Sequence, residues 1–287
     1  MDAFLQQALN GLTLGSIYGL VALGLTLVYG ILHVPNFAHG ALYMVGAYIS
    51  YYIMVDLGLN YWIAMLGAGL FVAVLSVLCE RLVFHPLRHA PPIHDKIAAI
   101  GILLFLEAVV QMHWGSDFRR MPTPYTGILE FGGLVLPAQR LLIIVGAFSI
   151  MGALHLYLKK TMTGSTIIAM AQNREGAFLV GIDANRVAMM TFAIAGFLAA
   201  VGASLFAPIN LGYPAMGHLV IMKAFVIIIL GGMGSIPGAI VGGLIIGFAE
   251  ALGGYYVSST YKDLIAFVLL VVILSIKPTG LFTKGVR

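Results

Sequence analysis

Residues 3–55 read AFLQQALNGLTLGSIYGLVALGLTLVYGILHVPNFAHGALYMVGAYISYYIMV and contain no Asp, Glu, Lys or Arg. A membrane-spanning helix needs about 20 predominantly apolar residues, so this stretch has room for two such helices. The rest of the chain is similar, because 61% of its 287 residues are apolar and only 9% are charged. So few charges cannot cover a surface that faces water. This composition excludes a soluble globular protein and a disordered one.

Six further stretches are free or nearly free of charged residues. They are residues 57–79, 97–114, 141–158, 187–222, 224–249 and 264–276. These stretches are too long and too uniformly apolar for the alternating strands of a membrane β-barrel. We therefore expect an all-α fold, a polytopic integral membrane helical bundle of eight or nine spans with broken helices. We expect residues 1–287 to form a single transmembrane domain.

The basic residues indicate how the bundle is oriented, because ten of the fifteen Lys and Arg residues lie in three segments. They are Arg81, Arg88, Lys96, Lys159, Lys160, Arg174, Arg186, Lys277, Lys284 and Arg287. Cytoplasmic loops carry an excess of basic residues, so we assign these segments and the C-terminus to the cytoplasm. The loop 115–139 is then outside. The N-terminus is outside if there are nine spans and inside if there are eight.

Two of the apolar stretches contain residues that interrupt a helix. The first reads YGILHVPNFAHGAL at 29–42, where Pro35 removes a backbone donor and Asn36 can cap the next helix. The second reads LGGMGSIPGAIVGG at 230–243, where Ser235 can start a helix after three glycines. Irregular backbone at membrane depth is tolerated where it contacts protein or water, so such breaks favour a substrate path. An ordinary turn between helices is the alternative.

The segment KKTMTGSTIIAMAQNREGAFLVGIDANR, residues 159–186, has the composition of a structured connection. We expect a short helix from about Arg174 to Val180, which Gly181 ends in the left-handed conformation. Asp183 is placed to cap the following span. Such a helix on the cytoplasmic side is suited to docking with another protein. The alternative is a helix that lies on the lipid headgroups.

Three ionisable residues, Glu107, Lys223 and Glu250, lie within apolar stretches. A charge at the centre of the membrane costs about 2.5–3.5 kcal/mol on insertion scales, so each of these residues should have a partner. Lys223 either meets the carboxylate of a substrate, pairs with Glu250, or extends its ammonium to a nearby membrane surface. Our candidates for the translocation path are Asn36, His39, Glu107, Lys223, Ser235 and Glu250.

The residue patterns favour neither catalysis nor a cofactor. His85 and His89 have the spacing of a helical metal site, but Pro86 interrupts the regular helix that such a site requires. The sequence contains no GxxxxGK[ST] phosphate-binding motif, so any ATP hydrolysis must take place on another chain. We therefore expect no catalytic residue, no metal, no cofactor and no nucleic-acid partner.

Several motifs, taken in order, resemble those of the integral-membrane permeases of branched-chain amino-acid ABC importers, of the LivH type. The resemblance covers essentially the whole chain. The matching motifs are LGLTLVYG, NFAHG (36–40), RHAPP (88–92), GSD (115–117), AQNREGAFLVGI (171–182), KAF (223–225), LGGMGSIPGAIVGG (230–243), AEAL, YKD and KPTGLF, the last three within 249–282.

The resemblance implies a non-catalytic permease in the bacterial inner membrane for branched-chain or related amino acids that a periplasmic binding protein delivers. It also implies a second permease subunit of the LivH or LivM type and two cytoplasmic ABC ATPases. A coupling segment at about 160–186 would dock on an ATPase. The coupling residues that the resemblance implies are Asn173, Arg174, Glu175, Gly176, Ala177 and Gly181.

Two alternatives to this function remain open. Related permeases are associated with urea, short amides and aromatic acids, so the solute could belong to one of these classes. A protein of another class, a stand-alone ion-coupled carrier or channel, would need no docking segment for an ATPase. It should contain more paired carboxylates within the membrane than the three isolated ionisable residues of this sequence.

Overall fold

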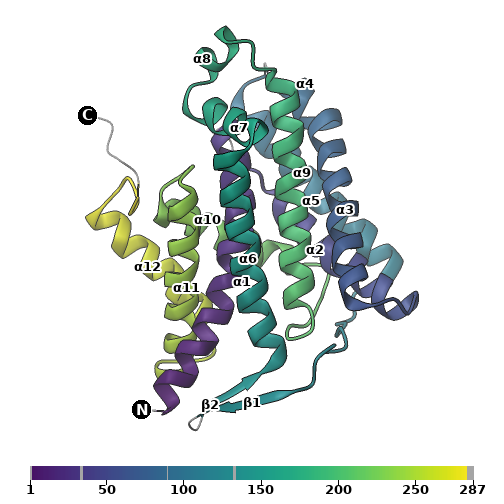
Figure 1. Ribbon diagram of the computed structural model, residues 1–287, viewed down its shortest axis with the longest axis vertical. Coiled ribbons are helices and arrows are strands. Elements are labelled where there is room, and N and C mark those ends of the chain that lie inside the picture. The colour runs from purple at the N-terminus through teal and green to yellow at the C-terminus, as the bar shows by residue number, and fades with distance from the viewer. Residues whose placement is uncertain (1, 33–34, 89, 132–133, 283–287) are drawn as a thin grey trace.

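The computed structural model describes the chain except for residues 1, 33–34, 89, 132–133 and 283–287. The protein is a bundle of helices that run mostly along the long direction of the molecule (Figure 1). Lys284 and Arg287, which we assigned to the cytoplasm, lie outside the described residues, and so does His89 of the histidine pair.

Helices make up nearly all of the described chain. The α-helices are α1 (Asp2–Leu32), α2 (Ala38–Tyr51), α3 (Tyr61–Cys79), α4 (His85–Leu87), α5 (Pro92–Trp114), α6 (Ala138–Lys160), α7 (Met162–Gln172), α8 (Arg174–Leu179), α9 (Ala184–Phe206), α10 (Met216–Gly231), α11 (Ile236–Tyr256) and α12 (Lys262–Ile276). Two π-helical segments, η1 (Tyr52–Asp56) and η2 (Glu80–Phe84), continue α2 and α3. The prediction of a helical membrane bundle is confirmed.

Within the described ranges, six helical segments are long and apolar enough to cross a membrane. They are Ala3–Ile31, Tyr61–Leu87, Ile93–Trp114, Ala138–Lys160, Ala184–Phe206 and Ile236–Tyr256. The helices α2, α10 and α12 have 14, 16 and 15 residues. Such helices are only about 21–24 Å long, which is shorter than the roughly 30 Å hydrocarbon core of a bilayer. The number of eight or nine spans therefore stays a prediction.

A small antiparallel hairpin, which the sequence did not predict, lies at the same end of the bundle as the start of α1 (Figure 1). It consists of β1 (Ile128–Phe131) and β2 (Leu134–Pro137). The Gln6 side chain pairs with the backbone of Val135. Its Nε2 donates to the Val135 oxygen at 2.9 Å, and its Oε1 accepts from the Val135 nitrogen at 3.0 Å. The helices α7 and α8 lie at the opposite end (Figure 1).

Glycines let α1 and α11 pack with their backbones in direct contact. A Cβ atom on Gly243 would overlap the backbone of Gly19, and one on Gly247 would overlap the backbone of Gly15. Small residues permit this close approach, which is the usual way for membrane helices to gain packing contacts. The contacts run in opposite directions along the two helices, so α1 and α11 are antiparallel.

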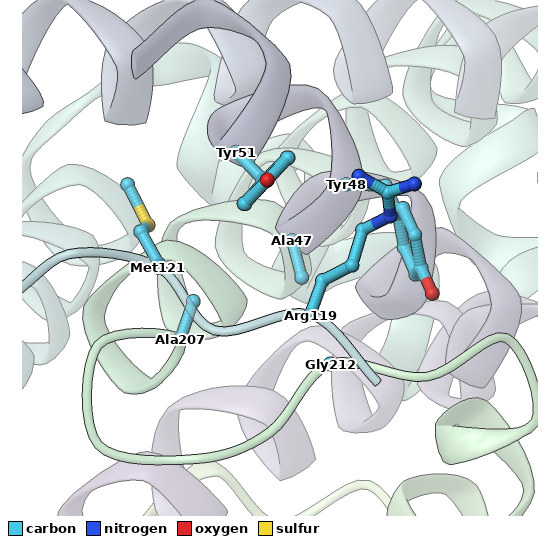
Figure 2. A pocket seen from close by; sticks show the side chains of 7 residues that line it. All are labelled: Ala47, Tyr48, Tyr51, Arg119, Met121, Ala207 and Gly212. Atoms are coloured by element: carbon cyan, nitrogen blue, oxygen red, sulfur yellow. The ribbon is translucent and has the colours of Figure 1, made fainter. Parts of the chain in front are cut away.

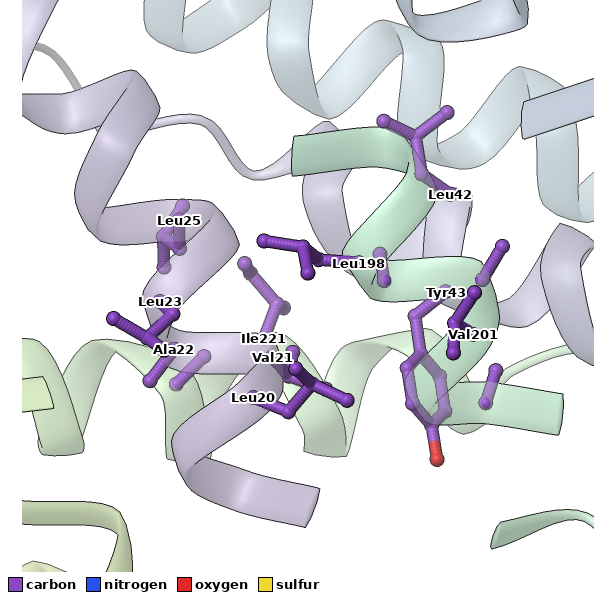
Figure 3. Close-up of a cluster of buried hydrophobic side chains, with 14 of the residues drawn as sticks. Leu20, Val21, Ala22, Leu23, Leu25, Leu42, Tyr43, Leu198, Val201 and Ile221 are labelled. Carbon is purple, nitrogen blue, oxygen red and sulfur yellow. The ribbon is translucent and has the colours of Figure 1, made fainter. Parts of the chain in front are cut away.

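The apolar core lies between α1, α2, α9 and α10. Figure 3 shows some of its side chains, among them Leu20, Leu42, Leu198, Val201 and Ile221, all of which are buried. The helices around this core carry large apolar side chains on their outer faces, such as those of α3, α5, α6 and α12. Outward apolar faces are expected where lipid takes the place of water.

The glycine contact between α1 and α11 yields a test of packing with a matched control. We expect Gly247→Ala to lower stability by about 1–3 kcal/mol, because the added methyl group forces the two backbones apart. Gly101→Ala is the control. A Cβ atom at this exposed position of α5 meets no neighbouring atom within 4 Å. Alanine there should raise stability by up to about 1 kcal/mol through its better helix propensity.

The melting temperature of the detergent-solubilised protein is measured by fluorescence-detected size-exclusion chromatography. Equal melting temperatures for the two variants would contradict the tight α1–α11 contact.

Candidate functional site

A buried cluster of polar side chains joins α1, α10, α11 and α12. The Lys223 ammonium lies 2.9 Å from Glu250 Oε2 and 2.7 Å from Asp263 Oδ1. It also donates to the Tyr18 hydroxyl at 2.8 Å, and that hydroxyl donates to Glu250 Oε2 at 2.8 Å. The sequence left three interpretations of Lys223 open. The structure shows one of them, the ion pair with Glu250, and adds contacts with Asp263 and Tyr18.

The cluster holds one more carboxylate than it holds ammonium groups. The Glu250 side chain is only 2% exposed, whereas that of Asp263 is 40% exposed. The Oε1 atom of Glu250 is buried and has no hydrogen-bond partner among the described residues. Removal of one partner of a buried ion pair leaves the charge of the other uncompensated. The Lys223 ammonium therefore stabilises the buried Glu250 carboxylate.

Two adjoining cavities open beside this cluster. One has a volume of about 270 Å³ and is lined by Tyr18, Lys223 and Asp263 among others. The second, of about 420 Å³, reaches towards Arg140 and Asn10. Both cavities are lined by Leu14, Phe206, Asn210, Glu250 and Lys262. The helices α1 and α11 are antiparallel, and Phe248 of α11 lies opposite Gly11, near the start of α1. Glu250 of α11 is therefore also near the start of α1. The cavities beside Glu250 thus lie towards the end of the bundle that holds the hairpin.

A third pocket, shown in Figure 2, is too small to hold a solute. Its volume is about 20 Å³, which is enough for about one water molecule. Arg119 lies over the ring of Tyr51, 5.5 Å from its centroid, and donates to the Trp114 oxygen at 2.8 Å. These contacts fix the loop that follows α5 against α2. We therefore read this pocket as a packing feature of the loop.

Two of the six path candidates act as helix starts at the sequence-predicted breaks. Asn36 Oδ1 accepts from the nitrogen of Ala38, at 3.1 Å, where α2 begins. Ser235 Oγ accepts from the nitrogen of Gly238, also at 3.1 Å, where α11 begins. The predicted cap by Ser235 is confirmed, whereas the N-cap position of α2 is occupied by Phe37, and Asn36 contacts the helix from one residue earlier. Their part in a solute path stays a prediction.

Two further candidates have partners away from the Lys223 cluster. His39 is fully buried, and its Nε2 lies 3.1 Å from the oxygen of Val21. Glu107 Oε2 lies 2.7 Å from His218 Nε2, which joins α5 to α10. The structure therefore brings Lys223 and Glu250 together and leaves the other four candidates in separate polar contacts.

The short helix α8 begins at Arg174, as the sequence predicts, and it follows α7, which begins at Met162 with Thr161 as its cap. Asn173 caps α8, because its Oδ1 accepts from the nitrogen of Gly176 at 2.8 Å. Gly181 has a φ of +82°, the left-handed conformation that ends the segment. Asp183 caps α9 through the nitrogen of Asn185 at 2.9 Å. The helix ends at Leu179, one residue earlier than expected.

The tip of this segment exposes apolar side chains that the sequence analysis did not single out. Phe178, Leu179 and Val180 are all exposed, Leu179 to 89%, whereas Ala177 beside them is buried. The signal was available, since the apolar residues 177–180 stand directly before Gly181 and follow the polar stretch 172–176. Exposed apolar residues in a row often mark an interaction site.

A cavity of about 160 Å³ lies where α7 packs against the bundle. Its walls include Ile167 and Ala171 of α7, Thr26 and Leu27 near the end of α1, and Gly234 in the second break. The segment that carries the exposed tip thus borders both α1 and the break before α11.

A second ion pair lies near the start of α9. Arg88 pairs with Glu80 and donates to the side-chain oxygen of Asn185. The Glu80 side chain is 1% exposed and that of Arg88 is 10% exposed. Glu80 opens the π-helical segment η2, and such segments are frequent at functional sites. The pairing of Arg88 with Glu80 could not be predicted from the sequence, because the two residues are eight positions apart.

Comparison with known proteins places these features in a family context. A family model described as "Branched-chain amino acid transport system / permease component" matches residues 7–274. The chain is 38% identical to the high-affinity branched-chain amino acid transport system permease protein BraD of Pseudomonas aeruginosa, over 98% of this chain and 96% of the relative. It is also 38% identical to the corresponding permease protein LivH of Escherichia coli K12, with the same coverage.

A solved structure has the same overall fold at low sequence identity. It is that of PsaBC from Streptococcus pneumoniae in complex with Fab, with a TM-score of 0.55 and 13% identity. The match covers 96% of this chain and 92% of the other. At this level of identity the likeness concerns the fold alone.

The Glu80–Arg88 pair gives a prediction about stability. We expect Arg88→Met to destabilise the protein by about 3–5 kcal/mol, because it leaves the buried Glu80 carboxylate without its cation. The combination of Glu80→Gln with Arg88→Met should recover most of this loss. Arg186→Met is the control, because Arg186 pairs with Asp183 at the surface, and it should cost less than about 1 kcal/mol.

Thermal melting of the four proteins in the same detergent measures these differences. An Arg88→Met protein as stable as the Arg186→Met protein would contradict the assignment of a buried, structurally necessary pair.

Proposed function

The chain belongs to the family of permease components of branched-chain amino acid transport systems, and from this premise we propose how it works within an ATP-driven importer. It is a non-catalytic, multi-pass membrane subunit of an ABC transport system. We propose that it pairs with a second LivH- or LivM-type permease in the bacterial inner membrane. Two cytoplasmic ABC ATPases and a periplasmic solute-binding protein complete the assembly.

We propose nine spans with the N-terminus outside and the C-terminus in the cytoplasm. The pairing of Gln6 with Val135 supports this orientation, because it holds the start of α1 beside the loop 115–139. The basic residues around α7 and α8 support a cytoplasmic location for the opposite end. The proposed spans are α1, α2 with η1, α3, α5, α6, α9, α10, α11 and α12.

The observation that carries the proposal is the exposed apolar tip of the segment 160–186. Phe178, Leu179 and Val180 project from a capped short helix at the cytoplasmic end of the bundle. Covering apolar surface gains roughly 25 cal/mol per Å², so a groove on an ATPase is a suitable partner for this tip. The matched family motif contains the same residues.

We propose two roles for the coupling residues that the family resemblance implies. Asn173, Ala177 and Gly181 build the helix through its cap, its buried face and its left-handed end. Arg174 and Glu175 are exposed on it and are available to an ATPase surface, and Gly176 is partly exposed next to them.

Movement of the tip would reach the bundle through α7. Closure of the ATPases pulls on α8, and α7 transmits this displacement to the end of α1 and to the break before α11, which border the same cavity. An ATPase pair that contacts α8 differently in its open and closed forms can shift the permease between two states.

We propose that the solute route passes the cavities beside Lys223 and Glu250. The other path candidates, Asn36, His39, Glu107 and Ser235, support the breaks and the helix contacts around this route. The support for this proposal is that charged groups, apolar walls and accessible space coincide at these cavities.

A substitution at the tip tests the docking proposal. We expect Leu179→Glu to abolish co-purification of the ATPases from gently solubilised membranes, because a charge then replaces the most exposed apolar contact. Loss of about 2–3 kcal/mol would lower the affinity roughly 30- to 150-fold. Leu57→Glu is the control, because Leu57 is an exposed apolar residue at the opposite end of the bundle. It should retain the ATPases.

Wild-type recovery of ATPases with Leu179→Glu would overturn this docking surface. The same preparations also test the alternative class of protein. If the purified chain alone moved leucine into liposomes without ATPases or ATP, it would be a stand-alone carrier. Competition by urea or an aromatic acid for ATP-driven leucine uptake would point to the other solute classes.

A substitution in the cluster tests the proposed route. We expect Lys223→Ala to lower ATP-driven leucine uptake by about tenfold or more, because it leaves two carboxylates unpaired at the cavity wall. Lys223→Arg keeps the positive charge and should retain more of the activity. Uptake is measured in proteoliposomes at equal protein incorporation. Wild-type uptake by Lys223→Ala would remove this residue from the route.

A further inference from the structure

The Lys223 cluster has acceptor atoms that its own donors cannot satisfy. An ammonium group has three N–H donors, and those of Lys223 serve Tyr18, Glu250 and Asp263. One oxygen of Glu250 has no partner among the described residues, and one oxygen of Asp263 is left beside the accessible cavity. A buried carboxylate oxygen without a partner, such as that of Glu250, is unfavourable, and the half-exposed Asp263 carboxylate can accept a hydrogen bond from the cavity. The cluster can therefore accept an external cation with several donors.

The same cavity has a cationic group that is not used by the cluster. Lys262 lines both cavities, directly before Asp263 in sequence, and its ammonium has no hydrogen bond or ion pair in the part of the chain that the structure describes. Lys223 has no donor left for a ligand carboxylate. An anionic group in the cavity would thus be bound by Lys262.

An apolar wall completes the site. Leu14, Ile17, Val21, Leu219 and Val220 line the cavity that holds Lys223 and Asp263. An apolar side chain gains about 0.8 kcal/mol for each CH₂ group that it buries, so this wall favours an aliphatic substituent. One cavity therefore presents a surplus carboxylate, a free ammonium group and an apolar surface.

We propose that this cavity binds the zwitterionic head group of an aliphatic α-amino acid. Asp263, with Glu250 behind it, accepts from the ligand ammonium, and Lys262 donates to the ligand carboxylate. This inference rests on the proposed role of the chain in amino acid import, and it adds a transient binding site within the permease itself. Lys223 is the positioning residue that holds both carboxylates at the cavity wall.

The charge arrangement distinguishes this ligand from other small molecules. A neutral amide or urea has no charge for either group, and a carboxylic acid without an ammonium group would meet the surplus negative charge of the cluster. A metal cation would use the carboxylates but would gain nothing from Lys262. Only a zwitterion engages all three parts of the site, which makes the proposal testable with analogues.

The test is equilibrium binding of tritiated leucine to the assembled permease and ATPases, purified without the solute-binding protein. Competition with two analogues separates the charged groups. Leucinamide keeps the ammonium group and lacks the carboxylate, and 4-methylpentanoate keeps the carboxylate and lacks the ammonium group. We expect each to compete at least about tenfold more weakly than leucine, because one charge-assisted contact is lost.

Two variants and a control assign each charge. Asp263→Asn should lower the affinity for leucine and leucinamide by about tenfold. The affinity for 4-methylpentanoate should stay unchanged or increase. Lys262→Gln should weaken leucine and 4-methylpentanoate and leave leucinamide unchanged. Asp56→Asn is the control, because Asp56 is exposed at the end of η1 and lines neither cavity, and it should match the wild type.

Several outcomes would overturn the site. One is equal binding of leucine to all four proteins, and another is the absence of leucine binding to the wild type. An equal loss of affinity for all three ligands in one variant would indicate that the variant has lost its structure and not the recognition of one charged group. ATP-driven leucine uptake with the binding protein present is measured in parallel. If the wild type takes up leucine but the competition results differ from those expected, the proposed binding site is wrong and the proposed function is retained. If the wild type shows no uptake, the proposed function is itself rejected.

Discussion

The backbone contact between α1 and α11 is the interaction on which the functional features depend. Because Gly15 and Gly19 meet Gly247 and Gly243 without intervening side chains, the two helices lie close enough for Tyr18 to reach Glu250. Lys223 then completes the cluster from α10. Larger residues along this contact would separate the hydroxyl from the carboxylate, so the polar site depends on the absence of side chains next to it.

The helix α1 also connects the two ends of the bundle. Its middle carries Tyr18 of the polar cluster, and its far end borders α7, the helix that leads to the exposed tip. The break before α11 borders the same space, so α1 ends and α11 begins beside the segment 160–186. A displacement of α7 can therefore reach the polar cavities through two rigid helices and needs no long chain of side-chain contacts.

Local features could be predicted from the sequence, because a helix cap depends on residues two or three positions away. The predicted caps by Asp183 and Ser235 follow from this rule. The helical membrane bundle could also be predicted, because each apolar stretch is a continuous run of the sequence. The joining of Asp263 to Lys223 could not be predicted, because it requires the arrangement of α10 and α12. The hairpin was missed because its strands are only four residues long.

The glycine contact has a further consequence for the membrane as an electrical insulator. Where the backbones of α1 and α11 touch, at Gly15, Gly19, Gly243 and Gly247, the seam between the helices has no space for a file of water molecules. Rearrangement of the bundle is expected instead on the side of α10 and α12, where the cavities lie. The closed part of this seam thus removes one route for ions through the helix bundle.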